Sequence, residues 1–273
     1  MGDPRMARQQ TVASFGYKWR TFPIIHPQWQ HHLTMWFLTM YGFTRATFQQ
    51  FIHGKTVLDA GCGMAWRTHW FHHLNPSGLV IGLDAAKEAV HTGNHVMDAE
   101  LIIGDLQRLP FPPDSFDYIA CEGVIHHTPD PRRALAELAR MLKPHGTLTL
   151  YIYKRKPPIR RLVDTVLRTI TTHLSPRACV LFSQLVTAVA HHLYRFNTTL
   201  QAVIYQHVIK CFWDWQGQSY ATSVAVNFDW YHPQYAHSFT DDDVRDLVAN
   251  AGLTIESMNP LMSAFAVKAK RGE

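Results

Sequence analysis

The feature that most constrains the fold is a short apolar run that ends in two closely spaced glycines. Residues 56–60 (TVLDA) are β-branched and apolar, and Gly61 and Gly63 follow them directly. This pattern predicts a buried strand that enters a tight turn. A helix is expected next, over residues 66–74, and the same order of strand and helix then repeats. Further strands are expected over residues 79–83, 101–103, 115–121 and 147–153, and further helices over 85–93 and 131–142.

Strands that alternate with helices at this spacing predict βαβ units, and therefore a parallel sheet with helices on both faces. The ligand site of such a sheet lies at the carboxyl ends of its strands. The alternation stops at Lys154 and resumes at Thr240, which caps an expected helix. Between these points three helices are expected, over 159–173, 176–196 and 198–213. After Thr240 the expected elements are a helix over 241–250 and strands over 254–258 and 263–268.

Acidic residues mark the ends of the first three expected strands. Asp59 opens the glycine turn, Asp84 ends the second strand, and Asp105 follows the third. Gly61 and Gly63 let a ligand approach backbone amides, because glycine carries no side chain. A carboxylate at the end of the second strand can hold both hydroxyls of a ribose, and one after the third can reach an adenine amine. The set predicts a nucleoside pocket; the alternative is that the glycines only permit tight packing and the acids cap helices.

The turn reads G-C-G-M-A-W rather than the G-x-G-x-x-G that seats a dinucleotide pyrophosphate, and an acid before it suits a cationic ligand. With Gly104 and Asp105, the pattern resembles the class I S-adenosylmethionine (SAM)-dependent methyltransferases, which share a D-x-G-x-G turn, an acid after the second strand and a G-D pair after the third. The resemblance continues through L-P-F at 109–111, S-F-D at 115–117, E-G-V-I-H-H at 122–127 and L-K-P-H-G at 142–146. Two positions depart from the family: Ala65 replaces the usual third glycine, and His145 interrupts K-P-G-G.

The resemblance covers residues 56–153 closely and 239–270 loosely. It implies an α/β, Rossmann-like fold with a mostly parallel seven-stranded sheet, SAM as the cofactor and S-adenosylhomocysteine (SAH) as the product. It also implies that Asp59, Gly61, Gly63, Asp84, Ala85, Asp105, Leu106 and Glu122 lie beside the cofactor. We therefore expect an N-terminal helical lid over 1–55, the SAM-binding core over 56–153, a helical substrate cap over 154–238, and completion of the core sheet over 239–273.

Methyl transfer from a sulfonium needs alignment, exclusion of water and, for some acceptors, a base. His126 and His127 directly follow the fourth expected strand, and a histidine pKa lies near the working pH. They are the candidate bases; the alternative is that they cap or pack. The N-terminal segment 14–20 is similar to one that precedes the core in some bacterial members of the family, where it suggests a lid. Tyr17 could then lie near the sulfonium, or the segment could simply anchor the terminus.

A second cluster lies where the insertion returns to the sheet, over residues 228–237. Its aromatic and polar side chains predict substrate contact, with packing of a returning loop as the alternative. The residues proposed for this contact are Trp230, Tyr231, His232, Tyr235 and His237. Histidine pairs four residues apart occur elsewhere, but no third ligand follows at a suitable spacing, so no metal is expected.

The charge of the chain is concentrated in the insertion. The whole chain carries a formal charge of +5, whereas the segment from Lys154 to Tyr220 has nine basic residues against two acidic ones. Its long apolar helix faces either pack on the sheet domain or, through 154–213, meet an anionic or membrane-resident partner at a membrane surface. Nucleic acid is the less favoured partner, because no separate RNA-binding module is visible.

Taken together, the sequence predicts a SAM-dependent methyltransferase that acts on a small, hydrophobic or aromatic metabolite at oxygen, carbon or nitrogen. The alternatives are a tRNA or rRNA methyltransferase, a SAM-binding protein without catalytic activity, and a nicotinamide-dependent oxidoreductase. Four cysteines without CxxC spacing and a polar start of the chain favour a reduced, cytoplasmic protein. The acceptor atom and the oligomeric state do not follow from the sequence.

Overall fold

A computed structural model describes residues 3–22, 27–96, 98–213 and 220–273. The chain divides into two compact units. The sheet unit contains residues 25–154 and 237–273, and the helical unit contains the N-terminal residues to 24 together with 155–236. The segment expected as one N-terminal lid is therefore divided: its first helix belongs to the helical unit, and residues 25–55 belong to the sheet unit.

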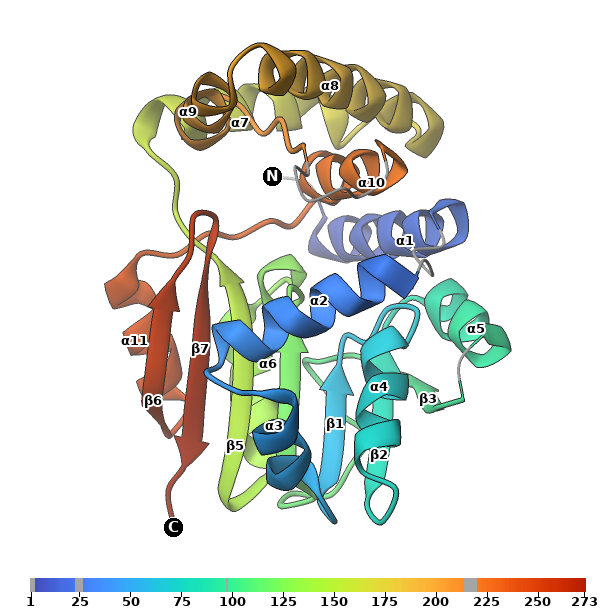
Figure 1. Cartoon of the computed structure of the whole chain (residues 1–273), viewed down its shortest axis with the longest axis vertical. Helices are drawn as coiled ribbons and strands as arrows, with labels where there is room; N and C mark the ends of the chain where they lie inside the picture. The colour runs from blue at the N-terminus through green and yellow to red at the C-terminus, as the bar shows by residue number, and fades with distance from the viewer. Residues whose placement is uncertain (1–2, 23–26, 97, 214–219) are drawn as a thin grey trace. The chain divides into compact units, whose positions relative to one another are not determined.

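The sheet unit is built on seven strands in the order β3-β2-β1-β4-β5-β7-β6 (Figure 1). Strand β7 runs antiparallel to both of its neighbours, and the other pairs are parallel. The expected mostly parallel seven-stranded α/β fold is thus confirmed. The strands are β1 (Thr56–Ala60), β2 (Leu79–Asp84), β3 (Glu100–Ile103), β4 (Phe116–Glu122), β5 (Leu142–Tyr153), β6 (Leu253–Pro260) and β7 (Ala264–Arg271).

Helices cover both faces of this sheet (Figure 1). The side chains of β1 alternate between the faces: Leu58 joins the core beneath α6 and α11, whereas Val57 joins the aromatic core beneath α2, α3 and α4. This alternation is what a strand buried on both faces requires. The helical elements of the unit are α2 (Pro27–Met40), α3 (Arg45–Ile52), α4 (Trp66–Leu74), α5 (Lys87–Val96), the short 3₁₀ helix η1 (Ile125–His127), α6 (Pro131–Met141) and α11 (Asp241–Asn250).

The helical unit packs the N-terminal helix with the helices of the insertion. Polar pairs join α1 to the end of α10: Ser14 Oγ lies 2.7 Å from His232 Nδ1, and Lys18 Nζ lies 2.6 Å from an oxygen of Asp229. The helices are α1 (Pro4–Thr21), α7 (Pro158–Thr171), α8 (Pro176–Phe196), α9 (Thr198–His207) and α10 (Tyr220–Tyr231). Among the described residues, no helix has both the length and the hydropathy needed to cross a bilayer.

Candidate functional site

The carboxyl ends of β1, β2 and β3 are joined by backbone hydrogen bonds. The amide of Gly61 donates to the carbonyl of Leu83 at 2.7 Å, and that of Gly104 donates to the carbonyl of Asp84 at 2.9 Å. Strand order reverses between β1 and β4, because β2 and β3 lie on one side of β1 and β4 and β5 on the other. An open α/β sheet binds its ligand at such a reversal. The expected pocket residues therefore converge on one edge of the sheet.

The glycine turn adopts a backbone that explains its sequence. Gly61 and Gly63 have positive φ angles, +79° and +56°. A Cβ on Gly61 would lie 2.3 Å from the Val124 side chain, so only glycine fits there. Ala65 also has a left-handed φ, +64°, at the start of α4. The third position of the motif thus requires the conformation that glycine favours, and alanine accepts it at a cost of roughly 1 kcal/mol.

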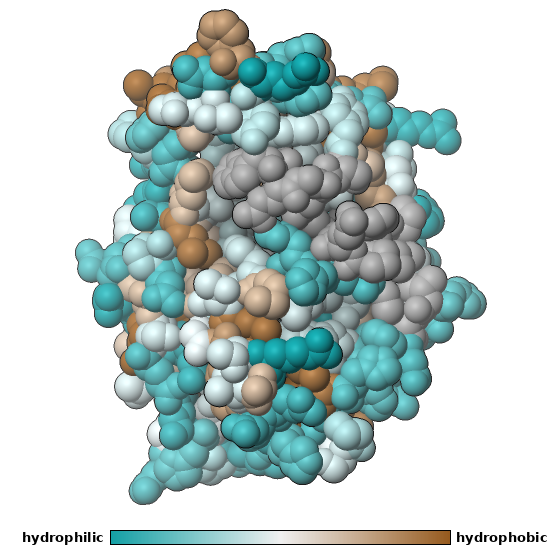
Figure 2. Space-filling model, viewed as in Figure 1, coloured by the Kyte–Doolittle hydropathy of each residue, from teal (hydrophilic) through white to brown (hydrophobic). Residues whose placement is uncertain are grey.

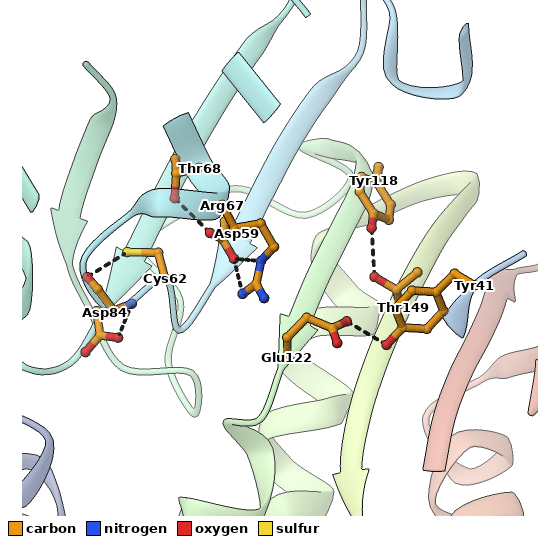
Figure 3. Close-up of polar contacts among 10 residues, drawn as sticks. Tyr41, Asp59, Cys62, Arg67, Thr68, Asp84, Tyr118, Glu122 and Thr149 are labelled. Carbon is orange, nitrogen blue, oxygen red and sulfur yellow. Dashed lines mark hydrogen bonds and ion pairs between the residues drawn. The ribbon is translucent and has the colours of Figure 1, made fainter. Parts of the chain in front are cut away.

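Asp84 binds the turn rather than only facing it. One carboxylate oxygen accepts the amide proton of Gly63 at 2.9 Å (Figure 3). The other accepts the amide proton of Ala86 at 2.8 Å. Ala85, which lies between Asp84 and Ala86 in the sequence, is exposed. After β3, a carboxylate oxygen of Asp105 accepts the amide proton of Gln107 at 3.0 Å, and Leu106 is buried. The two acids thus lie half-buried at neighbouring strand ends.

Asp59 is fully buried, and its carboxylate contacts the first helix after the turn. Arg67 donates to one oxygen from Nε at 2.9 Å and from a terminal nitrogen at 2.6 Å, and the Thr68 hydroxyl donates to the other at 2.8 Å (Figure 3). The negative charge of Asp59 raises the pKa of Arg67, outweighing the burial that lowers it. The three side chains fasten β1 to α4 on either side of the turn.

Glu122 ends β4 on the other side of β1. One oxygen accepts a hydrogen bond from the Tyr41 hydroxyl at 2.7 Å, and Oε2 is buried without a hydrogen-bond partner among the described residues (Figure 3). Burial raises the pKa of Glu122 to about 7, although the charge of Arg67 opposes that rise. A carboxyl that titrates near neutral pH at a strand end of this kind can exchange a proton.

The two candidate bases lie in η1, and both are buried. The ring of His126 stacks on that of Tyr153 with centroids 3.5 Å apart, and the ring of His127 meets the same tyrosine edge-on. His237 makes two contacts with this segment. Its amide donates to the carbonyl oxygen of His126 at 2.8 Å, and its Nε2 lies 3.1 Å from the carbonyl oxygen of Thr128. His237 thus belongs with the histidine pair in the sheet unit.

The other residues expected at the substrate lie within the helical unit. Trp230 and Tyr231 end helix α10 instead of lying in a returning loop, and they are buried. The Tyr231 hydroxyl donates to the carbonyl of Lys210 at 2.7 Å, and His232 packs against Ser14. Tyr235 donates its amide proton to the Thr11 hydroxyl, and Tyr17 contacts the Phe228 ring. Trp230, Tyr231 and His232 are thus buried in their own unit, and Tyr17 and Tyr235 are half-buried there.

Two residues of the site escape the sequence patterns. Arg67 lies on an expected helix, and only its spacing from Asp59 indicates that it turns inward to that acid. Tyr41 comes from the end of α2, far along the chain from Glu122. An arginine placed eight residues after an acid, across a glycine turn, is the only local signal for the first pair, and the second pair has none.

The edge of the sheet fits a nucleoside with a polar tail. Glycines at 61 and 63 leave the turn without side chains over its amides, and alternating left-handed residues are typical of backbone cradles for anionic groups. Asp84 and Asp105 supply acceptors at neighbouring strand ends. The described residues contain no group of three His, Cys, Asp or Glu side chains arranged to hold a metal ion.

Known proteins share this core. A family model described as a methyltransferase domain matches residues 58–150. The chain is 36% identical over 102 residues to a demethylmenaquinone methyltransferase from Listeria welshimeri, covering 35% of this chain and 43% of that protein. It is 34% identical over 122 residues to an uncharacterized Synechococcus protein, covering 40% and 28%. The chain thus spans less than half the length of either relative.

Among solved structures, a SAM-dependent methyltransferase from Mesorhizobium loti superimposes with a TM-score of 0.50. The superposition covers 81% of this chain and 92% of that one at 15% sequence identity. At that identity the likeness concerns the fold.

Proposed function

We propose that this chain, which belongs to the class I SAM-dependent methyltransferases, transfers a methyl group from SAM to a small hydrophobic or aromatic metabolite. The observation that carries the proposal is the edge of the sheet where the glycine turn meets two acids. Gly61 and Gly63 give the turn its left-handed backbone, and Asp84 and Asp105 lie half-buried at neighbouring strand ends. These are the groups that a nucleoside with a charged tail requires.

The turn and the two acids would hold the cofactor. Asp84 would accept the ribose hydroxyls while its bond to the amide of Gly63 fixes its orientation. Asp105 and Leu106 would contact the adenine, and the amides of the turn would meet the tail. Asp59 has a different role in this proposal: its oxygens bind Arg67 and Thr68, so it holds the turn in shape rather than contacting the ligand.

When bound, SAM supplies an electrophilic methyl group on a sulfonium. The chain must orient the acceptor and, where the acceptor carries a proton, remove it. His126 and His127 remain the proposed bases, and the stack on Tyr153 fixes the ring of His126. Glu122 is a further candidate, because its pKa of about 7 matches neutral conditions.

Two observations support a hydrophobic acceptor. The chain is 36% identical over 102 residues to a demethylmenaquinone methyltransferase, a relative that is named for a quinone. The helical unit, in addition, exposes large apolar side chains. Methylation of tRNA or rRNA is the alternative that the basic insertion favours. It predicts that the transferred methyl group appears in nuclease-sensitive RNA instead of a solvent-soluble metabolite.

Binding of SAH to the Asp84→Ala variant tests the pocket. Loss of two charge-assisted hydrogen bonds to the ribose is expected to weaken binding about 100-fold in isothermal titration calorimetry. Asp246→Ala, which removes an exposed acid from α11, is the matched control and is expected to bind SAH like the parent chain. Equal affinity in the two variants would rule out the proposed ribose contact.

A further inference from the structure

Helix α7 turns its polar face inward. Arg160 and Asp164, one turn apart, are buried and form an ion pair of 2.7 Å. Arg168, one more turn along, donates to the carbonyl of Pro233 at 2.8 Å and to that of Trp230 at the end of α10. An amphipathic helix on the surface of a globular protein normally buries its apolar stripe instead.

The apolar stripe of α7 faces outward. Ile159, Leu162, Val166 and Ile170 follow one another at spacings of three and four residues, so they share one face of the helix. All four keep more than half of their surface accessible, from 55% for Val166 to 68% for Ile159. The helix is therefore inverted with respect to the interior of its own unit.

Helix α8 also exposes an apolar stripe, although its inner face is mixed, with Cys179, Val186 and Ala190 buried beside two hydroxyl side chains. Its inner face carries the buried hydroxyls of Ser183 and Thr187, and the latter accepts a hydrogen bond from the Asn227 amide of α10 at 2.9 Å. Its outer face carries Leu181, Leu185 and Val189 at spacings of four, with exposures of 67%, 64% and 47%. We call these three residues, together with the four exposed residues of α7, the outward apolar face.

The outward apolar face continues at the end of α8 and along α9. Phe196 is 83% exposed, and Leu200 and Val203 of α9 are exposed as well. Figure 1 shows the three helices grouped at one end of the helical unit, and Figure 2 shows hydrophobic side chains among hydrophilic ones along the upper edge, over these helices. Monomeric proteins rarely expose so many large apolar groups without a partner.

The charged residues around the outward apolar face are almost all basic. Over residues 155–213 the only acidic residue is Asp164, which is buried against Arg160. The exposed charges of α7 and α8 are arginines: Arg161 lies beside Leu162, and Arg177 and Arg195 lie at the two ends of the leucine stripe of α8. Apolar side chains among exposed cations are typical of helices that lie in the interface of an anionic bilayer.

We propose that the outward apolar face docks the protein on an anionic membrane surface, with α7 and α8 lying in the headgroup region. A second copy of the chain fits less well, because its arginines would meet the same positive charges with no exposed acid on these helices to pair with them. RNA would use the arginines but not the exposed leucines. The helices do not cross the bilayer, in accord with their length and hydropathy.

The test is co-sedimentation of the full chain, without SAM, with two kinds of vesicle: pure phosphatidylcholine, and phosphatidylcholine with one third phosphatidylglycerol. Binding is expected to the anionic vesicles and to weaken as NaCl is raised. Arg177→Gln/Arg195→Gln is expected to weaken binding to the anionic vesicles about thirtyfold, since the attraction of an anionic surface for each basic residue corresponds to about a fivefold gain in affinity. Because no methyl transfer is measured, failure here is distinct from failure of the proposed function.

The apolar contribution is tested by Leu181→Glu/Leu185→Glu. The matched control is Met35→Glu/Leu79→Glu, which makes the same charge change at two exposed apolar side chains of the sheet unit. The leucine variant is expected to lose at least about tenfold in vesicle binding. The control variant carries the same added charge and is expected to stay within about threefold of the parent chain. Equal loss in both variants would overturn the proposal.

Sedimentation velocity of the same proteins addresses the competing occupants. The proposal predicts a parent chain and a Leu181→Glu/Leu185→Glu variant of the same mass. A parent dimer that the variant converts to a monomer, with no binding to anionic vesicles, would assign the face to a second copy. Binding of RNA that the arginine variant loses and the leucine variant keeps, with no vesicle binding, would equally overturn membrane docking.

Discussion

The two units of this chain place polar and apolar side chains in opposite ways. In the sheet unit, both hydrophobic clusters of the described residues fill the space between helices and strands, and the acids gather at strand ends. In the helical unit, ion pairs such as Arg160–Asp164 lie inside, and leucines such as Leu185 lie outside. Within the helical unit the outward apolar stripe recurs on both α7 and α8, whereas α10 buries apolar side chains such as Phe228.

The difference suits the two units to different binding partners. The sheet unit satisfies its own apolar side chains and leaves a polar edge, which suits a nucleoside cofactor. The helical unit buries polar side chains on α7 and α8 and exposes apolar and cationic ones on the same two helices, which suits a lipid surface. The hydrophobic methyl acceptor proposed above would dissolve in the lipid bilayer that such a surface contacts.

The largest loss of stability is expected at the buried ion pair of the sheet unit. Arg67→Met leaves Asp59 fully buried with no cation, and such loss of one partner costs about 3 to 5 kcal/mol. Urea-induced unfolding measures the loss. Arg245→Met breaks the exposed pair with Asp241 and serves as the control, with an expected change below about 1 kcal/mol. A small effect of Arg67→Met would mean that the turn does not depend on this pair.

A matched pair of leucine substitutions tests the contrast between the units. Leu150, in β5, is fully buried, so Leu150→Ala is expected to lower the free energy of unfolding by about 3 kcal/mol. Leu185→Ala on the outward apolar face is expected to change it by less than about 0.5 kcal/mol. Similar losses in urea unfolding would show that the outer leucines are packed, and the contrast would fail.

The pH dependence of stability is expected to reveal Glu122. Its pKa is higher in the folded state than the ordinary value of 4.5, so the folded protein binds this proton more tightly. The stabilisation is fully present below pH 4.5 and is lost as pH rises to about 7. Glu122→Gln keeps an acceptor for the Tyr41 hydroxyl and removes the titration.

Thermal unfolding across this range should therefore show a smaller decline in melting temperature for Glu122→Gln than for the parent chain. The variant is expected to gain on the order of 2 kcal/mol relative to the parent at pH 8. Parallel melting curves for the two proteins at all pH values would contradict a raised pKa at this position.

The smallest effect is expected at the third position of the glycine turn. Ala65→Gly relieves a left-handed φ but deletes a buried methyl group, and these contributions of roughly 1 kcal/mol each oppose one another. Calorimetry is expected to give an SAH affinity within about twofold of the parent. A gain of tenfold or more would show that alanine distorts the turn.

Much of the fold was predictable because periodicity and turn residues agree along the chain. The helix expected over 176–196 begins and ends at those residues, and the seven expected strands all form. The segment before Trp230 was not expected to be helical. Helix α10 is rich in β-branched and aromatic residues, which disfavour helix when taken alone, and it is held by packing on α8.

The site was predictable at its turn and less so around it. The glycines and Asp84 lie as their spacing indicates, because strand ends of a parallel sheet meet at one edge. The inward turn of Arg67 and the Tyr41–Glu122 bond join parts of the chain whose proximity only the folded sheet creates. The interior contacts of Tyr231 and His232 likewise depend on how α1, α8 and α10 pack.

The most direct test supplies methyl-labelled SAM and a whole-cell extract of the producing organism to the purified protein. Products are separated into organic-solvent, aqueous small-molecule and nuclease-sensitive fractions. The account predicts label in the organic-solvent fraction, lost with Asp84→Ala and kept with Asp246→Ala. Label that appears only in the nuclease-sensitive fraction would contradict it and assign the chain to RNA.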